Sequence, residues 1–152
     1  MHRFLFFIDN LNIGGFQRLC LDQAYALSDQ GYSVEIHVLT EAQVGSTLLN
    51  IEKEFILSHN IQIIYHSGKH MKQFVNFFKV SYGLRSGDMV VSHSLRATAI
   101  LGLIRLLLLT KFNFLTSIHQ LPSLSDPVQR RKRYIYAQFS PYLSAYSISV
   151  KK

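Results

Sequence analysis

Residues Phe4 to Leu39 read FLFFIDNLNIGGFQRLCLDQAYALSDQGYSVEIHVL. This stretch begins with one apolar run, Phe4–Ile8, and ends with another, Val34–Leu39, each of a length typical of a buried strand. Between them lie a loop that ends in Gly14-Gly15 and a segment of helical spacing that stops at Gly31. The pattern predicts a strand, a glycine loop, a helix and a parallel strand. A glycine pair where a buried strand leads into a helix is typical of sites that hold anionic or sugar ligands in α/β proteins.

The alternation of strand and helix continues along the rest of the chain. Strands are predicted at Phe4–Ile8, Val34–Leu39, Ile61–Tyr65, Met89–Ser92, Phe114–Ile118 and Tyr146–Val150, and helices at Phe16–Gln30, Thr47–Ser58, Met71–Tyr82, Leu95–Leu109 and Val128–Phe139. Because the strands are uniformly apolar, helices should cover both faces of the sheet. Strict alternation implies right-handed crossovers, so we expect an α/β fold with a doubly wound, Rossmann-like parallel sheet in one domain of residues 1–152.

Two of the helices carry an apolar stripe, which predicts the face that each turns to the core. The stripe of the first helix is Phe16, Leu19, Cys20, Gln23, Ala24 and Leu27, and that of the third is Met71, Phe74, Val75, Phe78 and Tyr82. Phe77 falls outside the second stripe, so we expect its ring to be exposed.

The composition narrows the class of protein. Of 152 residues, 48% are hydrophobic and 16% charged, and the formal net charge is +7, which favours anionic partners such as phosphates or phospholipid headgroups. The single Cys20 cannot form a disulfide within the chain, which favours the reducing cytoplasm. The first apolar run is too short for a secretory signal, and Ala97 to Leu109 is interrupted by Arg105. We therefore expect no segment that crosses a membrane.

Ligands of doubly wound sheets bind at the carboxyl ends of the strands, so the residues that follow each strand are candidates for a site. The loop from Asp9 to Gly15 follows the first strand. His93 and Ser94 follow the fourth strand, and His119 and Gln120 follow the fifth. We expect the two histidines and the glycine pair to meet at one edge of the sheet.

The common nucleotide motifs are absent from this edge. A dinucleotide fingerprint needs glycines spaced G-x-G-x-x-G, and here they are adjacent, although Glu41 does follow the second strand. There is no Gly-Lys-Ser/Thr of a Walker loop, and the seven histidines lack metal-ligand spacing. A dinucleotide-binding oxidoreductase therefore stays a minor alternative, and we expect no metal or other cofactor.

Three motifs, taken in order, resemble the start of the family-4 retaining glycosyltransferases, which have the two-domain GT-B architecture. The first is Asp9-Asn10-Leu11-Asn12-Ile13-Gly14-Gly15-Phe16-Gln17-Arg18, continued by Leu21–Leu27 and Gly31-Tyr32-Ser33-Val34. The others are Asp88-Met89-Val90-Val91-Ser92-His93 and Thr116-Ser117-Ile118-His119. The resemblance spans nearly the whole chain, and its first motif is the most specific.

The resemblance implies the N-terminal, acceptor-binding domain of an enzyme that moves a sugar from a nucleotide-sugar to an acceptor. The acceptor could be lipid-linked, in surface polysaccharide or glycolipid synthesis. Gly14 and Gly15 would approach the donor diphosphate, where a side chain would be in the way. His119 would contact the donor sugar at the reaction centre. Other residues implied to face the substrates are Asn12, Phe16, His93, Ser94 and Gln120.

The donor-binding half of that family, with its Glu-x7-Glu motif, has no counterpart in these residues. We therefore expect the isolated chain to lack activity and to need a C-terminal domain or a partner subunit. A binding or regulatory module that kept the fold without the chemistry is the main alternative.

Positive charge gathers in two places that predict contact with an anionic surface. One group, Lys69, Lys72 and Lys79, accompanies Phe77, and the other is Arg130-Arg131-Lys132-Arg133. Cations beside exposed aromatics suit an anionic bilayer interface, as for a peripheral protein on the inner face of the cytoplasmic membrane. Nucleic acid is a weaker alternative, because no recognised nucleic-acid fold fits the alternating pattern.

Overall fold

The computed structural model describes residues 2–12, 14–40, 59, 61–66, 68, 70–108, 112–118, 131 and 142–145. The helix predicted at Thr47–Ser58 lies outside these residues. So does the helix predicted at Val128–Phe139, apart from Arg131, which is helical.

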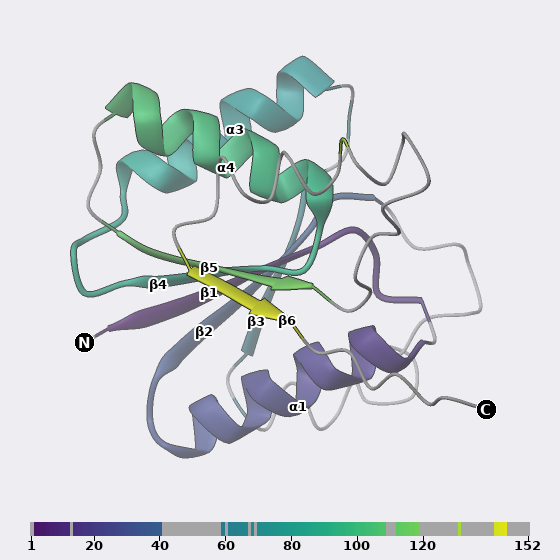
Figure 1. Cartoon of the computed structure of the whole chain (residues 1–152). Helices are drawn as coiled ribbons and strands as arrows, with labels where there is room; N and C mark the ends of the chain where they lie inside the picture. The colour runs from purple at the N-terminus through teal and green to yellow at the C-terminus, as the bar shows by residue number, and fades with distance from the viewer. Residues whose placement is uncertain are drawn as a thin grey trace.

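The described residues form one parallel sheet with helices on both of its faces (Figure 1). The strand order is β3-β2-β1-β4-β5-β6, and every neighbouring pair is parallel. In chain order the elements are β1 (Arg3–Ile8), α1 (Gly15–Asp29), β2 (Ser33–Val38), β3 (Ile61–Tyr65), α3 (His70–Tyr82), β4 (Met89–Ser92), α4 (Leu95–Leu108), β5 (Asn113–Ile118) and β6 (Tyr142–Ala145). The predicted doubly wound α/β fold is confirmed.

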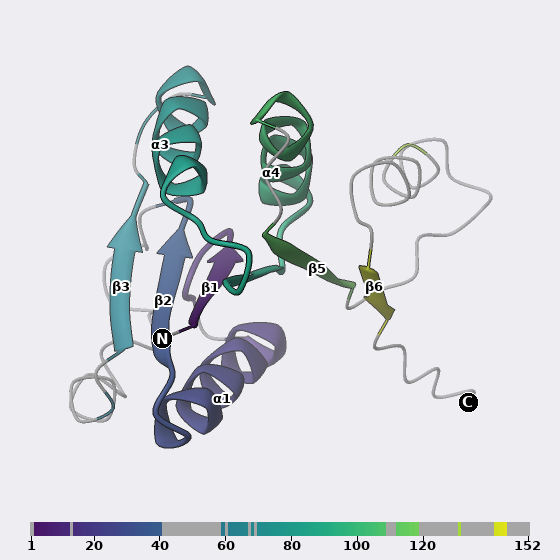
Figure 2. The ribbon, with the colours of Figure 1, turned by 90° about the vertical axis from the view of Figure 1, so that its left-hand side faces the viewer.

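The sheet divides the core into two layers. Figure 2 shows α1 on one face of the sheet and α3 and α4 side by side on the other. Along β1, Phe6 and Ile8 pack with the α1 layer, whereas Leu5 and Phe7 pack with the layer under α3 and α4. All four side chains are at most 2% exposed. Burying one such side chain contributes about 1.5–3 kcal/mol, so both faces of this strand stabilise the fold.

The end of α1 follows the sequence prediction. Gly31 has φ +82°, the left-handed conformation that glycine adopts without strain. The Gly31 amide donates to the Ser28 carbonyl at 2.8 Å, and the Tyr32 amide donates to the Leu27 carbonyl at 3.1 Å. These hydrogen bonds satisfy carbonyls of the last turn and end the helix, so that the chain can continue into β2.

The sixth strand differs from its prediction. We expected it at Tyr146–Val150, which lies outside the described residues, and the strand that the structure does describe is β6, Tyr142–Ala145, in register with Leu115–Ile118 of β5. The stretch from Tyr142 to Val150 contains only apolar residues and serines, and β-formers occur along all of it. Local pattern therefore cannot tell which part of it pairs, because the pairing partner is distant in sequence.

The orientation of α3 also differs from its prediction. Phe77 is fully buried, with its ring edge-on to that of Phe7 at 4.9 Å, whereas Met71 is 74% exposed and Tyr82 is 77% exposed. Gln73 is on the buried side too, and its amide donates to the Leu39 carbonyl at 2.8 Å. The apolar stripe was misleading because a polar side chain with a backbone partner occupies a core position. The expectation of an exposed Phe77 was wrong.

Among the described residues, no helix has both the length and the hydrophobicity that crossing a bilayer requires.

Candidate ligand site at the carboxyl edge of the sheet

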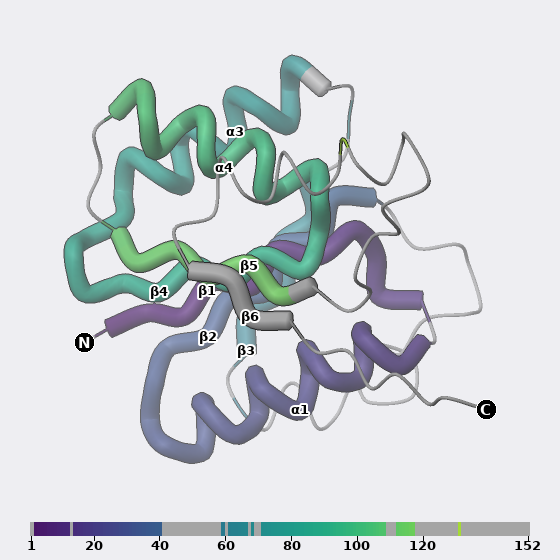
Figure 3. Tube along the Cα trace, in the orientation of Figure 1, coloured from purple at the N-terminus to yellow at the C-terminus, as the bar shows by residue number. Residues whose placement is uncertain are grey.

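The strand order reverses between β1 and β4, which makes this pair the switch point of the sheet. β1 and β4 are direct neighbours, with Phe7 opposite Ser92. Figure 3 shows that the helices following them, α1 and α4, leave the sheet on opposite faces. In open α/β sheets, the crevice outside the carboxyl ends of two such strands is the usual binding site.

Asp9 links three loops at this edge. Its carboxylate accepts a hydrogen bond of 2.6 Å from the Ser94 hydroxyl, which follows β4. Its carbonyl accepts one of 2.9 Å from the Thr40 amide, which follows β2. The sequence analysis placed Asp9 in the loop but did not single it out. Its position directly after a buried strand was the signal that could have identified it.

His93 and Ser94, both predicted to face a substrate, are held in structural contacts. Ser94 is 2% exposed, and its hydroxyl accepts a hydrogen bond of 3.2 Å from the Ala97 amide in the first turn of α4. His93 is 7% exposed and its ring stacks on Phe6, with centroids 5.9 Å apart and planes 16° apart. Both residues lie at the predicted edge, and their contact with a substrate stays a prediction.

The loop after β1 is organised by Asn10. The Asn10 side-chain oxygen accepts hydrogen bonds from the Asn12 amide and from the Gln17 side-chain nitrogen, each 3.1 Å long. Gln17 stands three residues after the helix cap Gly14, a position from which Gln often reaches back over a helix start. Asn10 and Gln17 both belong to the first motif of the sequence, but neither was assigned a role there, although that spacing could have revealed the role of Gln17.

The two glycines serve different purposes. Gly14 has φ −174°, an extended conformation open to any residue, so its backbone does not require glycine. A Cβ there would lie 2.3 Å from the Gln17 side-chain oxygen, so Gly14 makes room for that amide. Gly15 is exposed, and a Cβ on it would meet nothing within 4 Å. The open space is therefore at Gly15, in front of the first turn of α1.

Charge at this helix start favours an anion. Gly14 is the N-cap residue of α1 and has no side chain with which to cap the helix, and the first turn of α1 contains no acidic residue. The positive end of the helix dipole and the amides of the first turn therefore face the open space without a carboxylate of their own. Asn12 and Gln17 each keep one buried side-chain oxygen without a hydrogen-bond partner in the described part of the chain. These oxygens are acceptors that a donor group of a ligand could satisfy.

Several predicted residues are not placed by the structure. His119 and Gln120, which follow β5 in sequence, lie outside the described residues. Lys69, Arg130, Lys132 and Arg133 of the basic surface lie outside them too, whereas Lys72, Lys79 and Arg131 are exposed. In the described ranges, no cluster of three or more His, Cys, Asp or Glu side chains could hold a metal ion.

A separate cavity of about 310 Å³ lies between α1 and strands β1, β4 and β5. Its lining is mostly apolar and comprises Phe4, Phe6, Gln23, Ala26, Leu27, Met89, Val91, Leu115 and Ser117. None of the loop residues that organise the carboxyl edge lines it, so it is distinct from the crevice at Gly15.

Together these features define a Rossmann-like α/β domain in which an open helix start at the switch point favours an anion. No protein-family model and no curated protein matches the sequence. The crystal structure of Anabaena Alr3699/HepE in complex with UDP-glucose is similar, with a TM-score of 0.66 and 10% identity. The structure of HepE in complex with UDP is similar as well, with a TM-score of 0.62 and 9% identity. In each case the match covers 94% of this chain and 37% of the HepE chain.

At this level of identity the likeness establishes the fold alone. It agrees with the Rossmann-like α/β fold that the sequence predicted. The chain spans little more than a third of the length of the HepE chains that it matches.

Proposed function

We propose that this chain is the acceptor-side domain of a glycosyltransferase that uses a nucleotide-sugar donor. The observation that carries the proposal is the open, uncapped start of α1 at Gly15, located at the switch point between β1 and β4. The likeness in fold to a protein crystallised with UDP-glucose supports a nucleotide-sugar as the ligand class.

On this proposal the crevice holds the donor diphosphate from one side. The amides at the start of α1 would donate to the diphosphate oxygens, and the absence of a Cβ at Gly15 would let those oxygens come close. Asp9 would act through its partners, since it keeps the loops after β1, β2 and β4 in a fixed relation. His119 is proposed to contact the transferred sugar, as the family resemblance implies.

The other side of the donor would be held by a C-terminal domain or a partner subunit. Transfer with retention of configuration and without a required metal is the mechanism that the resemblance implies. A sugar or lipid-linked acceptor, surface polysaccharide or glycolipid synthesis and a cytoplasmic location are parts of the same proposal. Burial raises the pKa of the Cys20 thiol to about 12 and makes it unreactive, so this residue has no part in the proposed chemistry.

The alternative is a binding module of the same fold without catalysis. Both functions predict a nucleotide-sugar at the crevice, and turnover separates them. Adding a donor-binding domain that contains Glu-x7-Glu should produce transfer from UDP-glucose on the first proposal and none on the second.

The variant Gly15→Asp tests the crevice itself. The new carboxylate has space, and it suits the positive end of the helix, so folding should be preserved or improved by up to about 1 kcal/mol. The same carboxylate would repel and displace a diphosphate. We expect UDP-glucose binding, followed by NMR titration of the chain, to weaken by about tenfold or more.

Ser86→Asp is the matched control, because it adds the same charge at an exposed turn that precedes β4, away from the start of α1. Equal weakening by both variants would show a general charge effect and would contradict a diphosphate site at Gly15.

A further inference from the structure

The outward side of the α3–α4 layer exposes an unusual amount of apolar surface. On α4, Leu103, Leu106 and Leu107 are 43%, 65% and 63% exposed. On α3, Met71, Val75 and Tyr82 are exposed as well. These side chains point away from the sheet, since the residues of the same helices that face it, Phe77, Leu101 and Ile104, are fully buried. We name these six exposed residues the outer α3–α4 face.

Among the described residues of α3 and α4, the charged side chains are all positive. Lys72 and Lys79 are exposed on α3, beside the apolar side chains. Residues 70–108 contain a single carboxylate, Asp88, which is 1% exposed and paired with Arg3 at 2.9 Å. Burial raises the pKa of that carboxyl, but hydrogen bonds from the Arg85 amide and the Arg3 guanidinium outweigh it and hold the pKa below its usual range, so the carboxylate stays charged and internally paired.

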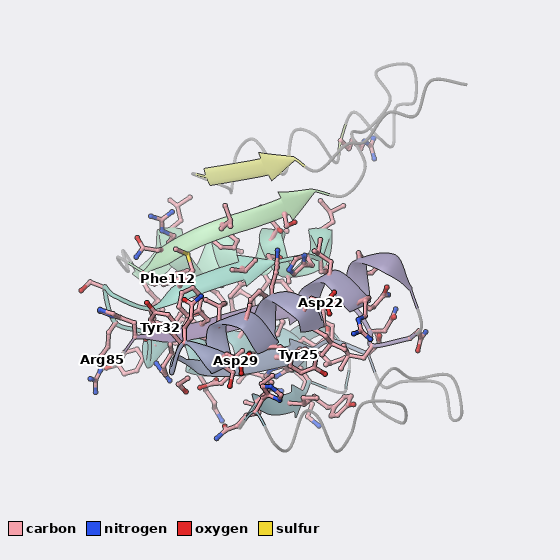
Figure 4. All side chains as sticks on the ribbon, turned by 90° about the horizontal axis from the view of Figure 1, so that it is seen from below. Asp22, Tyr25, Asp29, Tyr32, Arg85 and Phe112 are labelled. Carbon is pink, nitrogen blue, oxygen red and sulfur yellow. The ribbon has the colours of Figure 1, made fainter. Side chains whose placement is uncertain are left out.

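The opposite face of the sheet has a different character. Figure 4 shows Asp22 and Asp29 on α1, where their carboxylates are 51% and 68% exposed. The described surface is therefore asymmetric, with acidic side chains on the α1 side and only cations and apolar groups on the outer α3–α4 face.

The position of the exposed leucines argues against a second domain as their partner. They lie near the C-terminus of α4, which runs antiparallel to the strands, and so toward the amino edge of the sheet. The crevice that a second domain would complete is at the carboxyl edge. The chain between β5 and β6 is a poor partner on charge, since it contains Arg130-Arg131-Lys132-Arg133.

We propose that the outer α3–α4 face docks onto the surface of an anionic phospholipid bilayer. The leucines, Met71 and Val75 would enter the boundary between headgroups and acyl chains, while Lys72 and Lys79 would contact the phosphates. Tyr82 suits the same boundary, because its ring is apolar and its hydroxyl is polar. The earlier assignment of this role to Phe77 is replaced by side chains that are exposed. The proposal does not depend on transferase activity.

Co-sedimentation of the full chain with vesicles tests this docking. Vesicles of phosphatidylglycerol and phosphatidylcholine should bind the chain at least about tenfold more tightly than phosphatidylcholine alone. The triple variant Leu103→Gln, Leu106→Gln, Leu107→Gln should reduce binding to the anionic vesicles by about tenfold or more. All three positions are exposed, so the circular dichroism spectrum and the Tm should be retained.

A matched pair of charge variants separates docking from general attraction. Lys79→Gln should weaken anionic binding about fivefold, and Arg18→Gln, an equal change on α1, by less than about twofold. Equal loss in both variants, or equal binding to both kinds of vesicle, would overturn the proposal. So would a chain that forms dimers which the triple variant dissociates, because the face would then be a self-interface.

Discussion

At the scale of single residues, a buried pair of histidines, His37 and His66, makes the stability of the fold depend on pH at a place away from the candidate site. The ring nitrogens of His37 and His66 are 2.7 Å apart, and the other ring nitrogen of His37 is 3.1 Å from the Glu35 carboxylate. His37 stacks on Phe7, and His66 lies edge-on to Phe77. The Nε2 atom of a neutral His66 can accept a hydrogen bond from an N–H at Nδ1 of His37, whereas a proton on that Nε2 would set two N–H groups against each other.

This pair predicts that acid destabilises the protein. Burial, and secondarily the charge of His37, lower the pKa of His66 from 6.5 to about 4. Between those values the unfolded chain binds more protons than the folded one. The stability that the neutral ring contributes is therefore complete above pH 6.5 and is lost as the pH falls toward 4. Urea unfolding across this range should show a loss of about 2 kcal/mol that is attributable to His66.

His66→Gln provides the comparison. Its side chain can accept the hydrogen bond from His37 but does not titrate, so the slope of stability against pH should become shallower. Glu35 and Arg3, which lie beside His37, are unchanged in the variant. An unchanged slope would remove His66 as the origin of the acid sensitivity.

At the scale of elements, Ser94 at the start of α4 both caps the helix and holds Asp9 in the loop after β1. The Ser94 hydroxyl accepts from the Ala97 amide and donates to Asp9. Ser94→Ala removes the helix cap and leaves the Asp9 carboxylate with one partner fewer, so we expect a loss of about 1–2 kcal/mol in the free energy of unfolding. Denaturant titration measures it. Ser86→Ala, at an exposed turn, should change stability by less than about 0.5 kcal/mol. Similar losses at the two positions would contradict the capping role.

The corrected orientation of α3 gives a second prediction at this scale. Phe77→Ala should cost about 3–5 kcal/mol, because it empties a fully buried position between Phe7 and His66. Val75→Ala, at a position 44% exposed, should cost less than about 1 kcal/mol. Thermal or urea unfolding measures both losses. A larger loss for Val75→Ala than for Phe77→Ala would mean that α3 turns its apolar stripe to the core, as the sequence pattern indicated.

The elements show where sequence reasoning succeeds and where it fails. β3 and β4 are predicted to the residue, and α1 and α4 to within one residue at each end, because apolar runs and Gly31 mark them locally. The face of α3 was predicted wrongly, since Gln73 reaches the core through a bond to a distant carbonyl. At the site, the sequence identified the glycine pair. It could not show that Gly14 makes room for the Gln17 side chain while Gly15 faces open space, because this depends on where that side chain lies. Such non-local contacts leave no periodic signal in the sequence.

At the scale of the whole molecule, the topology explains why distant residues meet. The reversal of strand order places the loop after β1 beside the loop after β4, although Asp9 and Ser94 are 85 positions apart. The same arrangement sends α1 and the α3–α4 layer to opposite faces of the sheet, as Figures 1 and 2 show. The carboxyl edge of the sheet, the α1 side and the outer α3–α4 face are therefore three separate parts of the surface. A nucleotide-sugar, a second domain and a bilayer could therefore be engaged together without competing for the same surface.

The central claim is that a nucleotide-sugar binds at the start of α1. NMR titration of the isotope-labelled chain with UDP-glucose tests it most directly, since chemical-shift changes locate even weak binding. The account predicts saturable changes concentrated at the carboxyl edge, at the amides of Asn12, Gly14, Gly15 and Ser94, with little change on the outer α3–α4 face. Changes elsewhere on the surface that spare Gly14 and Gly15, or no changes at millimolar UDP-glucose, would contradict it.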